Sequence, residues 1–520
     1  MTVPPMIRKG LFLQMVSVLL SLLLGALVFG QAKAADLVIA RPFDADSLDP
    51  QSVAATYSLQ VTNLIFDTLL TMDKDGSIHP GLASDWEISD DGKSYSFTIR
   101  EGVKCHDGTV FDAKAAKESL DRALDPATLN PNRPLWGPIT GSAVDGNVLN
   151  VSLSERYGPF TAFLSGMQAA FPCPSSFNHA AFIPVGTGPF KFDKWTRNDS
   201  IELEANGDYK NTNPLVLNAG KPHIDRLIFK VIPDAVARMA ALRSGEVDLA
   251  EPSLQEARDL ASNSKFKVYV SELSGQQTFT SFTWKIKPLD DHNIRRAIGM
   301  ALNRKAYADV AFEGLSKPSS CPVAPNLFAT DEELCAMWGV KYDPAGAKAI
   351  LAAAGYTPDR PLKVKLVVYK GEGWDLMHQI MQQDLAAVGV QAEIETWDVA
   401  SFYGHIAELN TRTEGTPSIL SLGMSGVDPD YLYFLWRRPG ASNLGLNADL
   451  DIMLEEQRKL SGDDRARKLH EIQKYLLTNA YAIPLVSPGW GWLMASSSKV
   501  HDFKMGFMVS FLFNDVTVSD

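Results

Sequence analysis

Cysteine is scarce in this chain, with four residues among 520. So few cysteines exclude a small disulfide-rich scaffold, although an exported protein could still form one or two bridges. We expect Cys321 and Cys335 to pair, because they enclose the loop-like stretch PVAPNLFATDEEL. An unstrained bridge there would stabilise the fold by about 3 kcal/mol on the loop-entropy model. Four buried or free thiols are the alternative.

A basic tract and a membrane domain are also missing. The one long apolar run, residues 11–30, follows Arg8 and Lys9 and precedes small residues, a pattern typical of a secretory signal peptide cleaved after Ala34. An uncleaved anchor is the alternative for this run. Removal of residues 1–34 takes three basic residues and no acid, so the net charge changes from −12 to −15. So acidic a chain is a poor nucleic-acid binder, and the signal peptide predicts a soluble protein outside the cytoplasm.

Catalytic signatures are absent too. Neither G-x-S-x-G nor H-E-x-x-H occurs, GMSGV at Gly423 does not match the first pattern, and the S-x-x-K match from Ser496 to Lys499 lies in a serine-rich, turn-like stretch. The nine histidines, His378 and His405 among them, are dispersed without H-x3-H spacing. We therefore expect no catalytic residue, metal or cofactor. A secreted hydrolase or peptidase and a metal-chelate receptor are the alternatives.

The stretch SYSFTIREGVKCHDG, residues 94–108, gathers a cysteine, a histidine and an aspartate as an active site would. Its first half alternates polar and apolar residues, which predicts a half-buried strand. The Asp-Gly pair predicts a reversal, and Asp112 is placed to cap the helix that follows. We therefore interpret Cys105 and His106 as scaffold residues rather than as a thiol or metal site.

Two later regions predict β-α-β units. Residues 226–250 read as a strand, a helix capped by Asp234 and stopped by Gly245, and a second strand. Residues 362–397 repeat the pattern around a helix whose expected buried face is Leu376, Ile380, Met381 and Leu385. Helices that connect parallel strands indicate an α/β fold, and a chain of this length needs at least two lobes, each with its own core.

Six motifs follow one another along the chain: PGLASDWEISDDGKSYSFTIREGVKCHDGTVFDA, VGTGPFKFDKW, IDRLIFKVIPDAVARMAALRSGEVDLA, KPLDDHNIRRAIGMALNRKAY, YDPAGAKAILAAAGY and VDPDYLYFLW. Their sequence and order resemble family 5 of the extracellular solute-binding proteins, which serve ATP-binding-cassette importers. The resemblance implies a monomeric, non-enzymatic receptor for a peptide or another polar solute, with an amino-acid conjugate such as an opine among the candidates. It also implies a periplasmic location and delivery of that solute to an inner-membrane permease.

The resemblance further implies an α/β fold, namely a two-lobed periplasmic-binding-protein clamshell with an extra subdomain inserted in lobe I. Lobe I would comprise residues 35–59, residues 184–284 and a C-terminal return over residues 491–520. The inserted subdomain would span residues 60–183 and lobe II residues 285–490. We expect the hinge crossings near residues 282–285 and 488–492.

Ligands of the family lie between the lobes, which points here to six contacts: Tyr57, Trp374, Trp397, Tyr403, Ser425 and Asp428. Two departures from the family matter. Peptide-binding members place an aspartate shortly before the D-P-D motif, where this chain has residues 424–427, and dipeptide-type members place an arginine where this chain has Lys370. With both charged anchors missing, we expect aromatic packing and neutral hydrogen bonds to hold the ligand.

Overall fold

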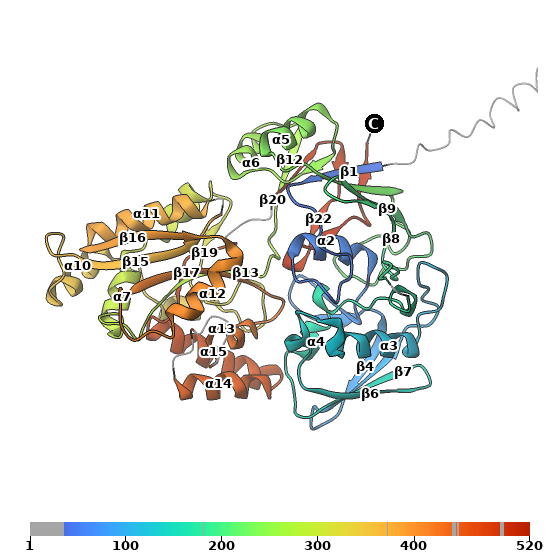
Figure 1. Ribbon diagram of the computed structural model, residues 1–520, viewed down its shortest axis with the longest axis horizontal. Coiled ribbons are helices and arrows are strands. Elements are labelled where there is room, and N and C mark those ends of the chain that lie inside the picture. The colour runs from blue at the N-terminus through green and yellow to red at the C-terminus, as the bar shows by residue number, and fades with distance from the viewer. Residues whose placement is uncertain are drawn as a thin grey trace, which may run out of the picture.

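The computed structural model describes residues 36–519, apart from 180, 372, 439–443, 445, 446 and 489–492. The chain forms two α/β lobes side by side, and a four-stranded subdomain adjoins the first lobe (Figure 1). The expected signal peptide, residues 1–34, lies outside the described residues. Within them, no helix combines the length and the apolar character needed to cross a membrane.

Lobe I is built on a seven-stranded mixed sheet. Its central strand, β1 (Asp36–Arg41), pairs in parallel with β10 (Arg226–Val231) and β11 (Leu249–Ala250). The other strands are β8 (Phe190–Thr196), β9 (Ser200–Ala205), β12 (Phe266–Val270) and β20 (Leu493–Ser497), in the order β12-β20-β11-β1-β10-β9-β8. Strand β20 returns the C-terminal part of the chain to this sheet.

The first predicted β-α-β unit is confirmed in this lobe. Helix α5 (Ala235–Ser244) connects β10 to β11. Asp234 caps it by accepting a hydrogen bond from the backbone N–H of Ala237. Gly245 ends it with φ of +78°, a conformation that costs glycine little. Helix α6 (Leu254–Ala261) follows β11 and packs against β12.

The inserted subdomain has its own sheet and core. Its strands are β4 (Ala83–Ile88), β5 (Ser94–Ile99), β6 (Ile139–Asp145) and β7 (Val148–Leu153), covered by helix α3 (Ala113–Leu124). Its buried apolar cluster runs from Leu69 to Cys173. Helix α2 (Thr56–Ile65) instead buries Val61 and Ile65 in the core of lobe I. The insertion therefore begins nearer residue 69 than the predicted residue 60.

Lobe II is built on a five-stranded sheet in the order β16-β15-β17-β13-β18. Strands β15 (Leu362–Tyr369) and β16 (Val390–Trp397) are parallel and connected by α11 (Trp374–Ala387), which confirms the second β-α-β unit. The other strands are β13 (Gln276–Phe282), β17 (Ser418–Ser425) and β18 (Ile483–Pro484). The helices are α7 (His292–Ala301), α9 (Glu332–Trp338), α10 (Pro344–Ala353), α12 (Val399–Leu409), α13 (Tyr431–Trp436), α14 (Ala448–Arg458) and α15 (Gly462–Thr478).

The first crossing between the lobes falls earlier than the sequence suggests. Strand β12 ends at Val270 in the sheet of lobe I, whereas β13 begins at Gln276 and pairs with β17 in the sheet of lobe II. The chain therefore crosses at residues 271–275, and residues 276–284 belong to lobe II rather than to lobe I. The expected crossing at residues 282–285 is wrong, because β13 reads as a strand in the sequence without revealing its sheet. The second crossing, residues 488–492, lies largely outside the described residues.

Helix α11 buries a face different from the predicted one. Its buried side chains are Trp374, Met377, His378, Met381 and Leu385. Leu376, predicted to be buried, is 41% exposed. Trp374 and His378 add large side chains to the apolar stripe, which rotates the buried face by about one residue and turns Leu376 outward.

Two disulfides connect the four cysteines. The bridge between Cys321 and Cys335 confirms the expected pair, and a second bridge joins Cys105 to Cys173. The alternative of four thiols is therefore wrong. The second pair lies 68 residues apart, and so wide a spacing carries no sequence signal.

The neighbouring His106 joins the subdomain to lobe I. Its Nε2 lies 3.0 Å from the carbonyl oxygen of Gly188, and its Nδ1 accepts a hydrogen bond from the backbone N–H of Gly186. Burial lowers the pKa of the imidazole to about 4, so the ring stays neutral near pH 7. These contacts fit the scaffold interpretation of this stretch.

We expect the intact chain to be lighter than its reduced form by two hydrogens for each disulfide. Replacing Cys105 and Cys173 with serine should lower the free energy of unfolding by about 4 kcal/mol, because the closed loop is long, against about 3 kcal/mol for Cys321 and Cys335. Non-reducing mass spectrometry and urea unfolding measure these effects. Four alkylatable thiols in the denatured, unreduced chain would contradict the expectation.

Candidate functional site

Both sheets turn the carboxyl ends of their parallel strands toward the boundary between the lobes. In lobe II, Gln276 follows the crossing and pairs with Ser425, the last residue of β17. In lobe I, β12 leads into the crossing and is antiparallel to β20, which is antiparallel to β11. The carboxyl ends of β11 and its parallel neighbour β1 therefore lie on the same side. Ligands of α/β proteins bind outside such strand ends.

Three of the residues singled out in the sequence meet at the lobe II edge. Lys370 follows β15, Trp397 ends β16 and Ser425 ends β17. The backbone N–H of Lys370 donates to the carbonyl oxygen of Trp397 at 2.9 Å. The parallel register thus brings together residues that are far apart along the chain.

Trp397 and Tyr403 are held by neighbours within lobe II. The indole of Trp397 stacks on the ring of His405 with centroids 3.9 Å apart, and its N–H donates to Glu395 at 3.0 Å. The Tyr403 hydroxyl donates to the carbonyl oxygen of Gly423 at 2.9 Å. Neither side chain lines the cavity between the lobes, and a ligand contact for them stays a prediction.

Trp374, also predicted to contact the ligand, is instead a core residue. It is the first residue of α11, and its side chain has no exposed surface. Its ring packs against Tyr369 and His378, with centroids 4.4 Å and 5.4 Å away. The prediction came from the place of ligands in the family, and the burial of the Trp374 side chain within lobe II corrects it.

Tyr57 lies at the opposite edge, in the first turn of α2 in lobe I. Its hydroxyl donates to the carboxylate of Glu251 at 3.0 Å, and Arg41 donates to its carbonyl oxygen at 2.7 Å. Burial and the nearby Glu251 charge raise the pKa of the Tyr57 phenol, which therefore stays protonated. Phe43, 61% exposed, packs edge-on against this ring. Whether Tyr57 touches the ligand stays a prediction.

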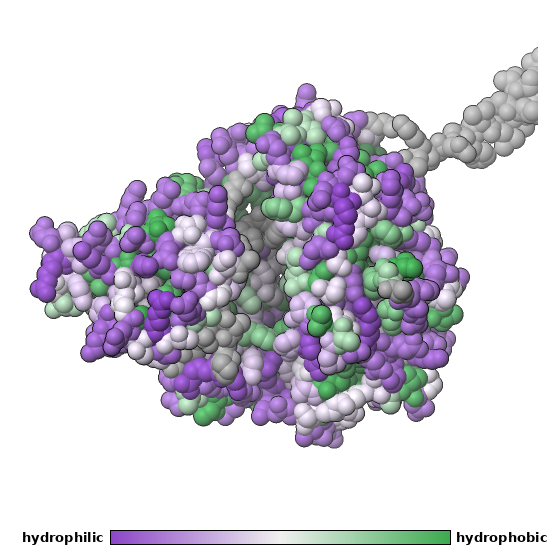
Figure 2. Space-filling view, viewed as in Figure 1, coloured by the Kyte–Doolittle hydropathy of each residue, from purple (hydrophilic) through white to green (hydrophobic). Residues whose placement is uncertain are grey.

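A cavity of about 250 Å³ lies between the inserted subdomain and lobe II, and Figure 2 shows the boundary of the lobes as a hollow. We call it the interlobe cavity. The subdomain and the segment before it contribute Ala54, Asn132, Leu135, Tyr157, Pro159, Phe163 and Gln168. Lobe II contributes residues 424–428, Asp430, Tyr431 and Phe434. Of the six predicted contacts, Ser425 and Asp428 line it.

The two acids of the D-P-D motif are neutralised by arginines from the helices of lobe II. Asp428 accepts hydrogen bonds from both terminal nitrogens of Arg465, one of them at 2.8 Å. Asp430 accepts from Arg458 at 2.9 Å. Burial raises the pKa of Asp430, and the Arg458 charge opposes that rise. Asp428 therefore holds lobe II together, and whether it also touches the ligand stays a prediction.

Tyr157 connects this ion-pair cluster to the inserted subdomain. Arg458 lies 4.9 Å from the centre of the Tyr157 ring and donates to its hydroxyl at 3.2 Å. The backbone N–H of the next residue, Gly158, donates to the carbonyl oxygen of Arg458 at 2.6 Å. A Cβ at Gly158 would lie 2.3 Å from the carbonyl oxygen of Leu460, so this close approach requires glycine. The two lobes therefore touch beside the interlobe cavity.

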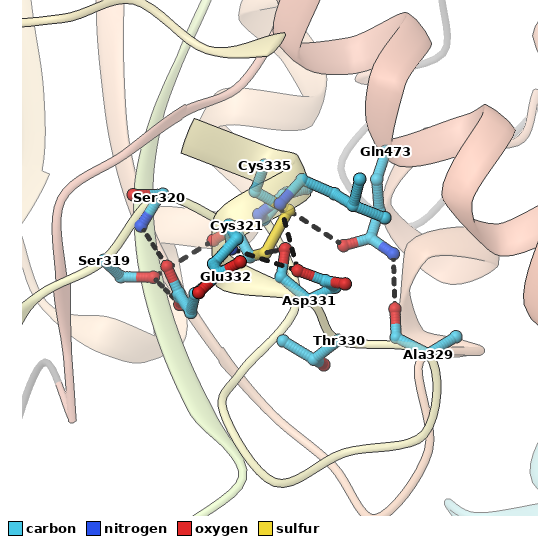
Figure 3. The surroundings of a disulfide bond; sticks show 12 residues. Ser319, Ser320, Cys321, Ala329, Thr330, Asp331, Glu332, Cys335 and Gln473 are labelled. Atoms are coloured by element: carbon cyan, nitrogen blue, oxygen red, sulfur yellow. Dashed lines mark hydrogen bonds between the residues drawn. A yellow bond between two sulfur atoms is a disulfide. The ribbon is translucent and has the colours of Figure 1, made fainter. Parts of the chain in front are cut away.

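Tyr431 is fixed by the loop that the Cys321–Cys335 disulfide closes. Its hydroxyl donates to the carbonyl oxygen of Pro322 at 3.2 Å and accepts from the N–H of Ala324 at 2.9 Å. Figure 3 shows the same loop tied to lobe II by Gln473, whose amide donates to the carbonyl oxygen of Ala329 at 2.8 Å. The disulfide thereby supports one wall of the interlobe cavity from behind.

Most residues of this cavity escaped sequence reasoning. Tyr431 and Phe434 stand in the recognisable motif VDPDYLYFLW, and their position directly after the D-P-D acids was the available signal. Asn132, Tyr157 and Gln168 come from the insertion, more than 250 residues earlier, and nothing local marks them. Only the packing of the subdomain against α13 and α14 brings the two sets together.

Comparison with known proteins identifies the family. The family model described as bacterial extracellular solute-binding proteins, family 5, matches residues 77–444. The glutathione-binding protein GsiB of Salmonella typhimurium is 30% identical over 376 residues, 71% of each chain. GsiB of Escherichia coli K12 is 29% identical over 373 residues, 70% of each chain.

Solved structures agree on the fold. The substrate-binding protein CtaP of Listeria monocytogenes superposes with a TM-score of 0.81 at 21% identity, over 94% of this chain and 100% of its own. NikA of Brucella suis, in complex with Fe(III)-EDTA, superposes with a TM-score of 0.80 at 23% identity, over 93% of this chain and 100% of its own. DppA of Helicobacter pylori, in complex with the peptide STSA, superposes with a TM-score of 0.72 at 25% identity, over 93% of this chain and 98% of its own. The chain thus belongs to the family 5 extracellular solute-binding proteins and has their two-lobed fold.

Proposed function

We propose that the interlobe cavity is the ligand site of this solute-binding component of an ABC importer, and that it encloses an uncharged part of the solute. The observation that carries the proposal is the pairing of charges in its wall. Asp428 is matched by Arg465, and Asp430 by Arg458. A buried charged group of the ligand would face no unpaired charge there, and its desolvation would go uncompensated.

The remaining lining suits a group with both amide and apolar character. Asn132, Gln168 and Ser425 offer neutral donors and acceptors, while Tyr431 and Phe434 offer aromatic surface. A volume of about 250 Å³ is enough for one or two amino-acid residues. We therefore infer a small peptide or amino-acid conjugate, a class that also fits the glutathione-binding relatives and the peptide complex of DppA.

Capture follows from the placement of the cavity between two lobes. A ligand that touches residues of both lobes stabilises the closed arrangement and shifts the population toward it. The crossing at residues 271–275 can move while the sheets stay intact, and Gly275 packs directly against Gly426. We infer a periplasmic, monomeric receptor that presents the closed form to an inner-membrane permease and performs no chemistry on the solute. Neither a secreted hydrolase nor a metal-chelate receptor is favoured by the relatives.

A substitution that fills the cavity tests the proposed site. In the variant Ser425→Trp, the indole should occupy the space of the ligand and weaken its binding by at least about a hundredfold. Native mass spectrometry of protein purified without refolding should find a small molecule bound to the wild type and none bound to this variant. Lys370→Ala, outside the cavity, is the control and should keep the molecule. Equal occupancy in Ser425→Trp and the wild type would refute the site.

A second substitution separates the structural role of Asp428 from ligand contact. Asp428→Asn should lower the free energy of unfolding by about 3 to 5 kcal/mol, because it leaves Arg465 buried without its counter-charge. Asp464→Asn removes the partner of Arg467 in an exposed pair and should change stability little. Urea unfolding of both variants measures the contrast. A stable Asp428→Asn protein that had lost only ligand affinity would assign Asp428 to the ligand.

A further inference from the structure

A second cavity lies in lobe I beside the interlobe cavity. We call it the inner chamber, and its volume is about 80 Å³. Residues 63–72, 165–167, 209–216 and 507–514 contribute its lining, together with Val427 of lobe II. Val427 also lines the interlobe cavity, and a Cβ at Gly166 would lie 3.3 Å from its side chain. Val427 and Gly166 are therefore the partition between the two spaces.

The inner chamber is polar, and its charge is of one sign. Neutral amides and hydroxyls line it, among them Asn63, Thr71, Asn211, Asn213, Ser510 and Asn514. Asp67 is the one acidic or basic side chain among its described lining residues. The chamber thus differs from the interlobe cavity, where each acid has an arginine partner.

The Asp67 carboxylate is held by hydroxyl donors, and the basic side chains Arg100, Lys104 and Lys210 share only the surface pocket on its other side. The carboxylate accepts from the Thr187 hydroxyl at 2.8 Å and from the Tyr209 hydroxyl at 3.3 Å. Within the described part of the chain, no lysine, arginine or histidine forms an ion pair with it. Burial raises its pKa to about 6, so the carboxylate is largely ionised at neutral pH. A half-buried carboxylate without an ion-pair partner is costly, and a bound cation would lower that cost.

We propose that the inner chamber is a subsite for a primary ammonium group of the imported solute, with the Asp67 carboxylate as its counter-ion. This deepens the proposed function and rests on it. The solute would place its uncharged part in the interlobe cavity and its ammonium-bearing end in the chamber, past Val427. The ligand class is then an amine-containing peptide or conjugate whose positive charge is recognised in lobe I.

The chamber fits an ammonium better than it fits other cations. A metal ion needs several charged or imidazole ligands, and the described residues contain no group of three or more histidine, cysteine, aspartate or glutamate side chains placed to hold one. A primary ammonium has three donors and needs one carboxylate with neutral oxygens around it. The carboxylate of Asp67 and the carbonyl and hydroxyl oxygens of the lining provide that set.

Ethylammonium is a probe for this subsite that needs no knowledge of the natural ligand, and ethanol is its neutral counterpart. We expect saturation-transfer NMR to detect ethylammonium on the wild type and a loss of affinity of roughly thirtyfold or more in Asp67→Asn. Asp208→Asn is the matched control, because this acid is exposed and lies outside the chamber. Ethanol should bind the variants and the wild type alike.

The dependence on pH provides a second measurement. Ethylammonium binding to the wild type should fall as the pH is lowered through about 6, because Asp67 then takes up a proton. Tyr209 faces Asp67 but stays protonated, since burial and the Asp67 charge raise its pKa well above the usual value. Arg100, Lys104, Asp208 and Lys210 face Asp67 from the opposite, surface side. Asp208→Asn should leave the pH profile unchanged, which separates the titration of Asp67 from that of Asp208, the other acid of this group.

Three outcomes would overturn the proposal: no ethylammonium binding to the wild type, equal binding to Asp67→Asn, or no change of binding between pH 5 and pH 8. Thermal unfolding of Asp67→Asn checks its fold, and if that variant unfolds, the pH profile of the wild type decides. Ser425→Trp should still bind ethylammonium, because it fills only the interlobe cavity. A failure of the subsite is therefore distinguishable from a failure of the proposed function.

Discussion

The buried pairing of Asp428 with Arg465 and of Asp430 with Arg458 is the interaction on which the interlobe cavity depends. These ion pairs fix the loop that connects β17 to α13, so that Tyr431 and Phe434 face the inserted subdomain. The pairing also removes net charge from the cavity, which sets the kind of group that can be buried there. Through Arg458 it touches Tyr157, so the same pairing forms part of the contact between the lobes.

The α/β architecture was predictable because its signals are local. Asp234 and Gly245 stand directly before and after α5 and mark its two ends. Residues 362–397 show the strand, helix and strand patterns in one continuous stretch. The assignment of β13 was not predictable in this way. A buried strand looks the same in either sheet, and only its pairing with β17 shows that the crossing precedes Gln276.

The sequence reveals where a residue ends a strand, but it does not reveal how tertiary packing turns the side chain. Ser425 ends β17 and lines the interlobe cavity, as a strand-end residue can. Trp374 begins α11 at a similar edge, yet its side chain turns into the core. The pairing of Asp428 was not foreseen, because its partner Arg465 lies 37 residues further on. Tyr157 and Gln168 depend on the docking of the insertion, which no local pattern encodes.

The two disulfides connect the first cysteine to the second and the third to the fourth along the chain. Four cysteines allow three pairings, and this is the one in which every bridge joins neighbours in sequence. In a chain that crosses a membrane amino terminus first, each unpaired thiol meets its native partner as the next one to emerge. Oxidation in the order of arrival then produces the native set without any reshuffling.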